Sequence, residues 1–179
     1  MKKFVIDECN KILNNPEDYL LMDAEMTGVG NDDEIIELAL VDLNGNEIYH
    51  ELFYPEAPIS IEAGYIHQIK EEDLFDSPRF AEAWPAIFEQ IKGKTLLIYN
   101  ARSDIQMMYQ TLKKQKAKSP MIKNLCVQQL YEKFCGLKRS VKLEFACEQM
   151  GLIFEQNHRA TDDCLMTLAL IKAMAKSEL

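Results

Sequence analysis

The sequence contains no run of about 18 apolar residues, the shortest stretch that readily crosses a bilayer as a helix. Its first residues, MKKFVIDECNKI, reach Asp7 and Glu8 before an apolar signal segment could form. Both absences argue against a membrane-embedded or exported chain, so we expect a soluble cytoplasmic protein.

The cysteines show no Cys-x-x-Cys spacing, and their number, five, does not allow all of them to pair within one chain. These features argue against a zinc site and against a disulfide framework. We therefore predict reduced and mostly buried thiols at Cys9, Cys126, Cys135, Cys147 and Cys164.

Repeats, low-complexity linkers and any polymerase or helicase segment are also absent from the 179 residues. With 47% hydrophobic residues, a chain of this length can bury one core of its own. We predict a single domain over residues 1–179, in which a short N-terminal helix at about 4–14 precedes the first strand.

Positive charge is scarce, because 20 Lys and Arg stand against 29 Asp and Glu and give a net charge of −9. This balance argues against a protein that coats nucleic acid through bulk electrostatics. From Lys113 to Lys142, however, there are nine basic residues and one acid, a charge of +8, which leaves −17 for the remainder. A run such as KKQKAK is commonly a solvated helix end, and it is also a surface that phosphates could meet.

Apolar patterning predicts an α/β domain. Two strand-like runs, IIELALVDL and EIYHELFY, flank Asn44-Gly45, a strong hairpin signal, and form a three-stranded meander with residues 19–25. The run TLLIY at 95–99 suits a strand buried on both faces. Residues 55–78 contain three prolines and predict loops and short helical turns. Helical periodicity predicts the remaining elements, at 79–91, 102–117, 124–134, 141–150 and 161–176. Together these elements indicate one mixed sheet with helices packed on it.

Two acids stand two positions apart in the stretch LLMDAEMTG, which reads as a β-strand. Strand alternation places Asp23 and Glu25 on one face of the strand. Leu20, Met22 and Ala24 then point to the other face. Two adjacent carboxylates repel each other unless a cation intervenes, and hard divalent ions such as Mg²⁺ favour carboxylate oxygen. Taken alone, such a pair is most often a solvated acidic face.

Two further acids follow predicted strand and helix boundaries. Asp104 comes just after the strand 95–99, in the first helical turn and four residues after Asn100. Asp163 opens the last predicted helix, and His158 lies in the loop before it. Locally, each has an ordinary explanation as a helix-terminal acid or a surface histidine.

Taken in order, the three motifs Asp-x-Glu-x-Thr-Gly, Asn-x-x-x-Asp and His-x-Ala-x-x-Asp resemble the DEDD 3′→5′ exonuclease superfamily. The histidine of the third motif is similar to the DEDDh subgroup, which includes the proofreading subunit of bacterial DNA polymerase III, ribonuclease T and oligoribonuclease. The resemblance covers roughly residues 18–175, and IHQI at 66–69 also falls where that family has a recurrent motif. The chain departs from the family pattern at Met26, Gln68, Tyr99 and Ser103, which puts nucleotide preference in doubt more than the chemistry.

The resemblance implies a ribonuclease H-like fold, a mixed β-sheet flanked by helices, with two divalent cations, Mg²⁺ or Mn²⁺. It implies that Asp23, Glu25 and Asp163 ligate metal directly and that Asp104 helps to hold the second ion. Two ions about 4 Å apart suit phosphodiester hydrolysis, because they can stabilise both the attacking and the leaving oxygen.

The same resemblance assigns roles to the remaining motif residues. His158 would be the general base, since an imidazole titrates near neutrality. Thr27 and the Gly28 backbone resemble the family's contacts to the terminal 3′ nucleotide. Asn100 and His67 would lie near that nucleotide or support the residues that bind it.

We expect a 3′→5′ exonuclease that releases nucleoside 5′-monophosphates from single-stranded or frayed 3′ ends of DNA. One alternative keeps the chemistry and changes the substrate to RNA, as in ribonuclease T or oligoribonuclease. A second is a catalytically silent module that binds nucleic acid or a partner, although a silent site would not need four carboxylates and His158 together. A homodimer and a polymerase partner on a separate chain are both left open.

Overall fold

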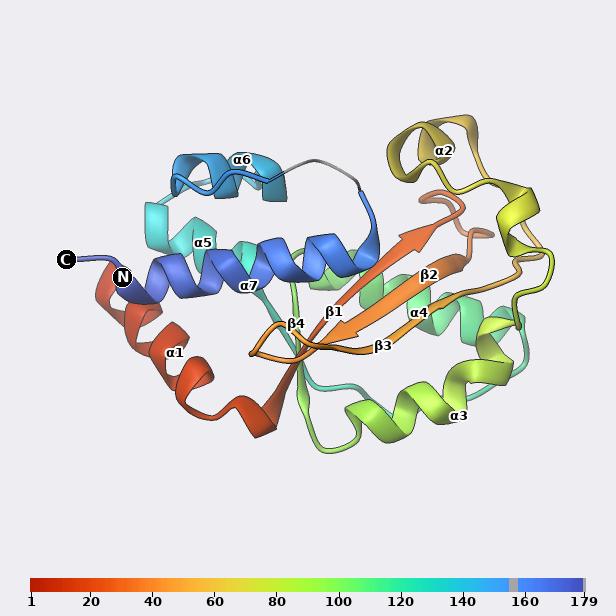
Figure 1. Ribbon diagram of the computed structural model, residues 1–179, viewed down its shortest axis with the longest axis horizontal. Helices are drawn as coiled ribbons and strands as arrows, with labels where there is room; N and C mark the ends of the chain where they lie inside the picture. Colours follow the sequence, from red (N-terminus) through yellow and green to blue (C-terminus); the bar gives the residue numbers. More distant parts are fainter. Residues whose placement is uncertain (155–157, 179) are drawn as a thin grey trace.

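The five strands form one mixed sheet in the order β3-β2-β1-β4-β5. The structure, a computed structural model, describes residues 1–154 and 158–178 (Figure 1). β1 pairs antiparallel with β2, and β2 with β3, whereas β1–β4 and β4–β5 are parallel. The strands are β1 (Tyr19–Met26), β2 (Ile35–Val41), β3 (Glu47–Leu52), β4 (Thr95–Ile98) and β5 (Asn124–Cys126).

Helices cover both faces of this sheet. One face packs on α1 (Lys2–Asn14), α5 (Val127–Cys135), α6 (Leu143–Gln149) and α7 (Ala160–Lys176). The other packs on α3 (Phe80–Ile91) and α4 (Ala101–Lys114). The short α2 (Ile61–His67) lies beyond the C-terminal end of β1, and the two chain ends lie side by side at the far end of the molecule (Figure 1). Single 3₁₀ turns occupy Pro16–Asp18 and Glu71–Leu74.

Strand β1 is buried on both faces, and this double burial positions its acids. Leu20 and Met22 belong to the core under α3 and α4, whereas Leu21 belongs to the core under α7. Because side chains alternate along a strand, Asp23 and Glu25 continue the face of Leu21. The two acids therefore point to the side of the sheet from which α7 approaches.

Most elements confirm the expectations from the sequence, including the hairpin turn, where Gly45 has a φ of +91°. Two expectations are wrong in part. The segment 124–134 begins as the strand β5, because pairing with β4 overrides the helical pattern of a three-residue stretch. The helix expected over 102–117 ends at Lys114, and Lys116 then turns the chain with a φ of +61°.

The cysteines are mostly buried, as the sequence predicts. All five thiols are free, and Cys9, Cys147 and Cys164 are buried. Among the residues that the structure describes, no helix has both the length and the apolar composition needed to span a bilayer.

Candidate active site

All five predicted catalytic residues line one cavity of about 670 Å³. Its lining residues come from the C-terminal end of β1 and the loop after it, from α2, and from the starts of α4 and α7. β1 and β4 are parallel neighbours, so their C-terminal ends open at the same edge of the sheet. This topology brings together residues far apart in the sequence: Asp23, Glu25, Asp104, His158 and Asp163.

Three carboxylates converge closely enough to share an ion. One oxygen each from Asp23, Glu25 and Asp163 lie within 4.8 Å of one another. The first two come from alternate positions of β1, and the third comes from the first turn of α7. Asp104, 5% exposed on the first turn of α4, lines the same cavity but stands outside this triplet.

Burial raises the pKa of every one of these acids. It raises the pKa of Glu25 to about 8, with neighbouring carboxylates adding to the effect. For Asp104, burial raises the pKa to about 7, although backbone N–H groups oppose the shift. Asp163 has a pKa raised by burial to about 6, with His158 opposing, and the pKa of the buried Asp23 is well above its ordinary value.

These shifts describe a site with more negative charge than it can neutralise by itself. A cation placed among the carboxylates would favour their ionised forms. Oxygen-rich donor sets of this kind suit hard divalent ions rather than Zn²⁺ structural sites, which use mostly sulfur and nitrogen. The residues present therefore fit the divalent cations that the sequence pattern implies.

His158 reaches the cavity from the segment just before α7. Its φ of +44° lies in the left-handed region, which residues other than glycine rarely adopt. Its Nδ1 is 3.6 Å from Oε1 of Glu144 on α6. The histidine is therefore held in an uncommon backbone conformation, with one ring nitrogen turned toward an acid.

The loop after β1 forms one wall of the cavity, and Gly28 lines it. A Cβ at Gly28 would come within 2.6 Å of Oδ2 of Asp33, so the turn leaves no room for a side chain. Thr27 is fully buried and does not line the cavity. Its hydroxyl donates to Oδ1 of Asp33 at 2.7 Å and accepts from the Glu34 N–H at 3.0 Å. Thr27 thus supports the loop from behind.

His67 and Asn100 were both predicted to lie near the terminal nucleotide, and the structure places His67 at the cavity and Asn100 outside it. His67, at the end of α2, is 2% exposed and lines the cavity. Its Nδ1 accepts the Ile69 N–H at 3.0 Å, while its buried Nε2 has no hydrogen-bond partner among the residues that the structure describes. Burial lowers the pKa of His67 and favours the neutral ring. Asn100 is exposed before α4 and is not among the lining residues.

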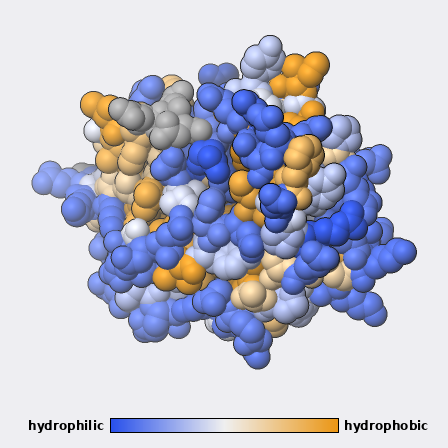
Figure 2. Space-filling view, turned by 45° about the vertical axis from the view of Figure 1, so that its right-hand side comes forward, coloured by the Kyte–Doolittle hydropathy of each residue, from blue (hydrophilic) through white to orange (hydrophobic). Residues whose placement is uncertain are grey.

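Apolar surface borders the cavity on the side of α2. Val29 and Ile66 both line it and are both largely exposed. Hydrophilic side chains dominate the face shown in Figure 2, and smaller apolar patches lie between them, one of them at the upper right of that view. This rim offers an apolar contact beside the carboxylates.

The sequence analysis missed an ion pair that lies directly beside the site. Glu37, on β2, is opposite Glu25 in the strand register and is fully buried. The guanidinium of Arg159 binds its carboxylate through Nε at 2.9 Å and through Nη2 at 2.6 Å. The signal was present in IIELALV, where one acid interrupts an otherwise apolar strand, because a buried charge requires a partner.

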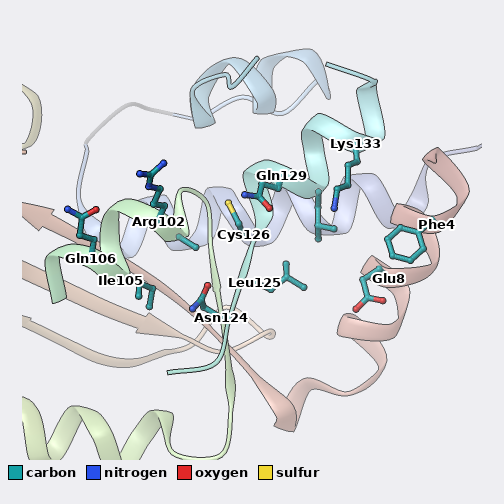
Figure 3. Close-up of a pocket in the computed structure, with 12 residues that line it drawn as sticks. Phe4, Glu8, Arg102, Ile105, Gln106, Asn124, Leu125, Cys126, Gln129 and Lys133 are labelled. Atoms are coloured by element: carbon teal, nitrogen blue, oxygen red, sulfur yellow. The ribbon is translucent and has the colours of Figure 1, made fainter. Parts of the chain in front are cut away.

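A second cavity of about 670 Å³ lies between α1, α4, α5 and the edge strand β5. Arg102 and Gln106 line it from α4, Gln129 and Lys133 from α5, and Phe4 from α1 (Figure 3). Glu8 is its sole carboxylate among the lining residues, so it lacks a set of acids that could hold a divalent ion.

Comparisons with known proteins agree on one family. The family described as exonuclease (RNase_T) matches residues 20–171. An uncharacterized exonuclease, CP81, of Escherichia phage 186 is 31% identical over 89% of this chain and 89% of its own length. The DNA polymerase III subunit epsilon of Treponema pallidum is 29% identical over 87% of this chain and 75% of its own.

Two solved structures share the fold. Exonuclease X in complex with 5′-overhanging duplex DNA aligns with a TM-score of 0.68 and 23% identity, covering 89% of this chain and 92% of that one. A 3′-exonuclease described in the 3′-end-specific recognition of a histone mRNA stem-loop aligns with a TM-score of 0.76 and 16% identity. That match covers 89% of this chain and 64% of the other.

Proposed function

Because the chain belongs to the exonuclease family and is a 3′→5′ exonuclease, we propose that it removes nucleoside 5′-monophosphates from 3′ ends of DNA at the cavity beside β1. The observation that carries this assignment is the convergence of Asp23, Glu25 and Asp163 within 4.8 Å. Hydrolysis at this position requires the chain to hold cations, to orient an attacking water and to seat the terminal nucleotide.

Asp23, Glu25 and Asp163 would hold the cations, and Asp104, which lines the same cavity, would help with the second. The exonuclease family depends on divalent metal, and we propose Mg²⁺ or Mn²⁺ here because both accept all-oxygen donor sets. Bound at this cluster, such ions stabilise the negative charge that develops on the phosphate during hydrolysis.

His158 is proposed as the general base. It lines the cavity within reach of the same space as Asp163, and its Nδ1 is turned toward Glu144. The other ring nitrogen, Nε2, is then the one that accepts a proton from the attacking water. An imidazole is suited to this step near neutral pH, because both of its protonation states are accessible there.

The 3′-terminal nucleotide is proposed to sit between the Gly28 loop and α2. The absence of a side chain at Gly28 leaves room for the Asp33 carboxylate, which lines the same cavity and fixes the shape of this loop. Val29 and Ile66 supply apolar surface against which the terminal base can pack. His67 completes this wall, and Thr27 acts indirectly by holding Asp33. Asn100 is exposed and does not line the cavity, so the terminal nucleotide is assigned to the other three residues.

DNA is the proposed substrate, and RNA is the alternative with its own support. One relative is a subunit of a DNA polymerase, and one structural neighbour was solved with duplex DNA. Another neighbour is described with a histone mRNA stem-loop. The two substrates differ at the 2′-hydroxyl, so discrimination depends on the shape of the nucleotide pocket.

A polymerase on a separate chain is a candidate partner, because one relative is a DNA polymerase III subunit, and a second copy of this chain is the other candidate. A free or frayed 3′ end of single-stranded nucleic acid is the part of any substrate that reaches the cavity. Sedimentation of the purified chain, alone and mixed with a candidate polymerase, distinguishes monomer, homodimer and complex.

The experiment that tests the proposal uses 5′-labelled DNA and RNA oligomers of one sequence, incubated with Mg²⁺, Mn²⁺ or a chelator. We expect a ladder that shortens from the 3′ end of DNA, that disappears with chelator, and that is missing for Asp23→Asn. Oligomers with a blocked 3′ terminus serve as the control. Faster degradation of RNA would overturn the choice of DNA, and the absence of any ladder would overturn the assignment of this cavity.

A further inference from the structure

Glu37 is the most highly hydrogen-bonded carboxylate beside the site, although it lines no part of the cavity. Its side chain is 1% exposed. Arg159 donates from Nε to both carboxylate oxygens, at 2.9 and 3.1 Å, and from Nη2 to Oε1 at 2.6 Å. The backbone N–H of Ala160 donates to Oε2 at 3.1 Å, and Nε2 of His50 is 2.7 Å from Oε1.

These contacts bind the segment that carries His158 and Asp163 to strand β2 of the sheet. Arg159 immediately follows His158, and its carbonyl accepts the backbone N–H of Asp163 at 3.0 Å. Its side chain, meanwhile, is bound to β2 through Glu37. One residue therefore connects the sheet, the proposed base and the first turn of α7.

The backbone of His158 shows why such a fastening is needed. A φ of +44° is disfavoured for a residue with a side chain, and it persists where the surrounding structure fixes it. On the C-terminal side of His158, the next residues in the chain are held to the sheet by the guanidinium of Arg159 and the N–H of Ala160, both bound to Glu37. Releasing these contacts would allow His158 to relax toward an ordinary conformation, away from the cavity.

The geometry of the pair matters as much as its charge. A guanidinium presents several N–H groups in a rigid plane that matches a carboxylate, whereas a lysine ammonium is a point charge on a flexible stem. Replacing Arg159 by lysine therefore keeps the positive charge beside Glu37 and Glu25 but removes the fixed orientation. Arg159→Lys therefore distinguishes the effect of the side chain's orientation from the effect of its positive charge.

We propose that Glu37 and Arg159 form a positioning clamp that holds His158 over the carboxylate cluster, so that Arg159 is a positioning residue for the hydrolysis. The clamp rests on the proposed role of His158 as the general base. It acts through the orientation of that histidine and leaves the hold on the cations to the four acids of the cavity.

The test compares Arg159→Lys in the wild-type chain and in a His158→Ala background, using a short DNA oligomer with Mn²⁺. In the wild-type background we expect kcat to fall about tenfold to a hundredfold with little change in KM, since a misplacement of about 1 Å can cost about a hundredfold. In the His158→Ala background the same change should have almost no effect, because interacting residues are not additive.

One binding measurement and two further variants accompany the kinetics. Mn²⁺ affinity, measured by the loss of the free-ion paramagnetic resonance signal, should change less than about threefold. Arg79→Lys serves as the matched control and should leave kcat unchanged. Arg79 forms an exposed ion pair with Glu56, with 2.6 Å between Nη2 and Oε1, and neither residue lines the cavity. His50→Ala removes one contact to Glu37 and should lower kcat a few-fold. This milder variant replaces Arg159→Lys in the test if Arg159→Lys folds poorly.

Three results would overturn the clamp, and they point to different causes. If Arg159→Lys lowers kcat equally in both backgrounds, or weakens Mn²⁺ binding in proportion, Arg159 acts through the acids or the fold and the base assignment stands. If His158→Ala retains wild-type turnover, the base assignment itself fails and the clamp fails with it.

Discussion

Glu25 and Glu37 lie directly opposite each other on the antiparallel strands β1 and β2, on the same face of the sheet. Their environments are nevertheless opposed. Arg159, His50 and a backbone N–H lower the pKa of Glu37 despite its burial, whereas burial and nearby acids raise the pKa of Glu25 to about 8. The charge of Glu37 is compensated by protein groups, whereas the charge of Glu25 calls for a cation.

This contrast predicts opposite effects for the same substitution at neighbouring positions. In chelator at pH 8.5, Glu25→Gln should raise the melting temperature by a few degrees, because it removes a repelled charge. Glu37→Gln should instead cost about 1–3 kcal/mol, because it leaves Arg159 without its partner. Thermal melts of the two variants measure this, and activity should be lost for Glu25→Gln. Equal destabilisation by both substitutions would show that Glu25 is an ordinary structural residue.

The acids also predict how the stability of the metal-free protein varies with pH. Burial raises the folded-state pKa of Asp163 to about 6, of Asp104 to about 7 and of Glu25 to about 8. The folded state then binds more protons than the unfolded state above about pH 4, so the stability present at low pH is lost as the pH rises toward 8.

Melting temperatures in chelator should therefore fall between about pH 5 and pH 8, whereas Mn²⁺ should stabilise the protein increasingly over the same range. The control is Asp104→Asn/Glu25→Gln, in which two of the titrating groups are removed and the slope should flatten. A metal-free protein whose stability rises over this range would contradict the idea of an uncompensated cluster.

Asp104 provides a test that separates catalysis from folding. Asp104→Ala should abolish cleavage while the domain stays folded, because this acid lines the cavity to help hold an ion and is repelled by Asp163 in the metal-free protein. Oligomer assays and thermal melts in chelator give the two readouts. Near-normal turnover, or a protein that unfolds at room temperature, would remove Asp104 from the proposed cation site.

The sequence was sufficient for the carboxylates because their positions follow from local rules. Strand alternation at Asp23 and Glu25 and helix starts at Asp104 and Asp163 needed only the correct elements, and the exonuclease resemblance that linked them is confirmed by the family match. The expected ribonuclease H-like architecture and the 3′→5′ exonuclease activity are likewise confirmed.

What the sequence did not predict depends on contacts between distant segments. Glu37 and Arg159 are 122 positions apart, and only the packing of α7 on β2 brings them together. The edge strand β5 is three residues long, too short for a periodic pattern, and forms because β4 offers it partners. The hydroxyl of Thr27 turns to Asp33 because the loop folds back, which residue spacing alone does not indicate.

The lysines at the end of α4 are predicted to guide the nucleic acid, with one exception that the structure identifies. Lys114 binds the buried Glu34 at 2.9 Å and the Asp32 carbonyl at 2.8 Å, so it belongs to the fold. Lys113, Lys116 and Lys118 are exposed. Lys113 is nine residues along α4 from Asp104, about 13 Å at 1.5 Å per residue, within reach of phosphates a few nucleotides upstream of the cut.

Changing Lys113, Lys116 and Lys118 to glutamate should raise KM for a 20-nucleotide strand and flatten the salt dependence of binding, because fewer phosphates are neutralised. Turnover at saturation should stay near wild type, since phosphate contacts at this distance position the strand without touching the reacting bond.

Dinucleotides, too short to reach these lysines, are the internal control and should be cleaved as before. The matched variant Lys2→Glu/Lys11→Glu changes charges on α1 and should leave the salt slope unaltered. If the triple variant binds the 20-nucleotide strand with the wild-type affinity and slope, these lysines form only a solvated helix end, and the strand approaches the cavity over another surface.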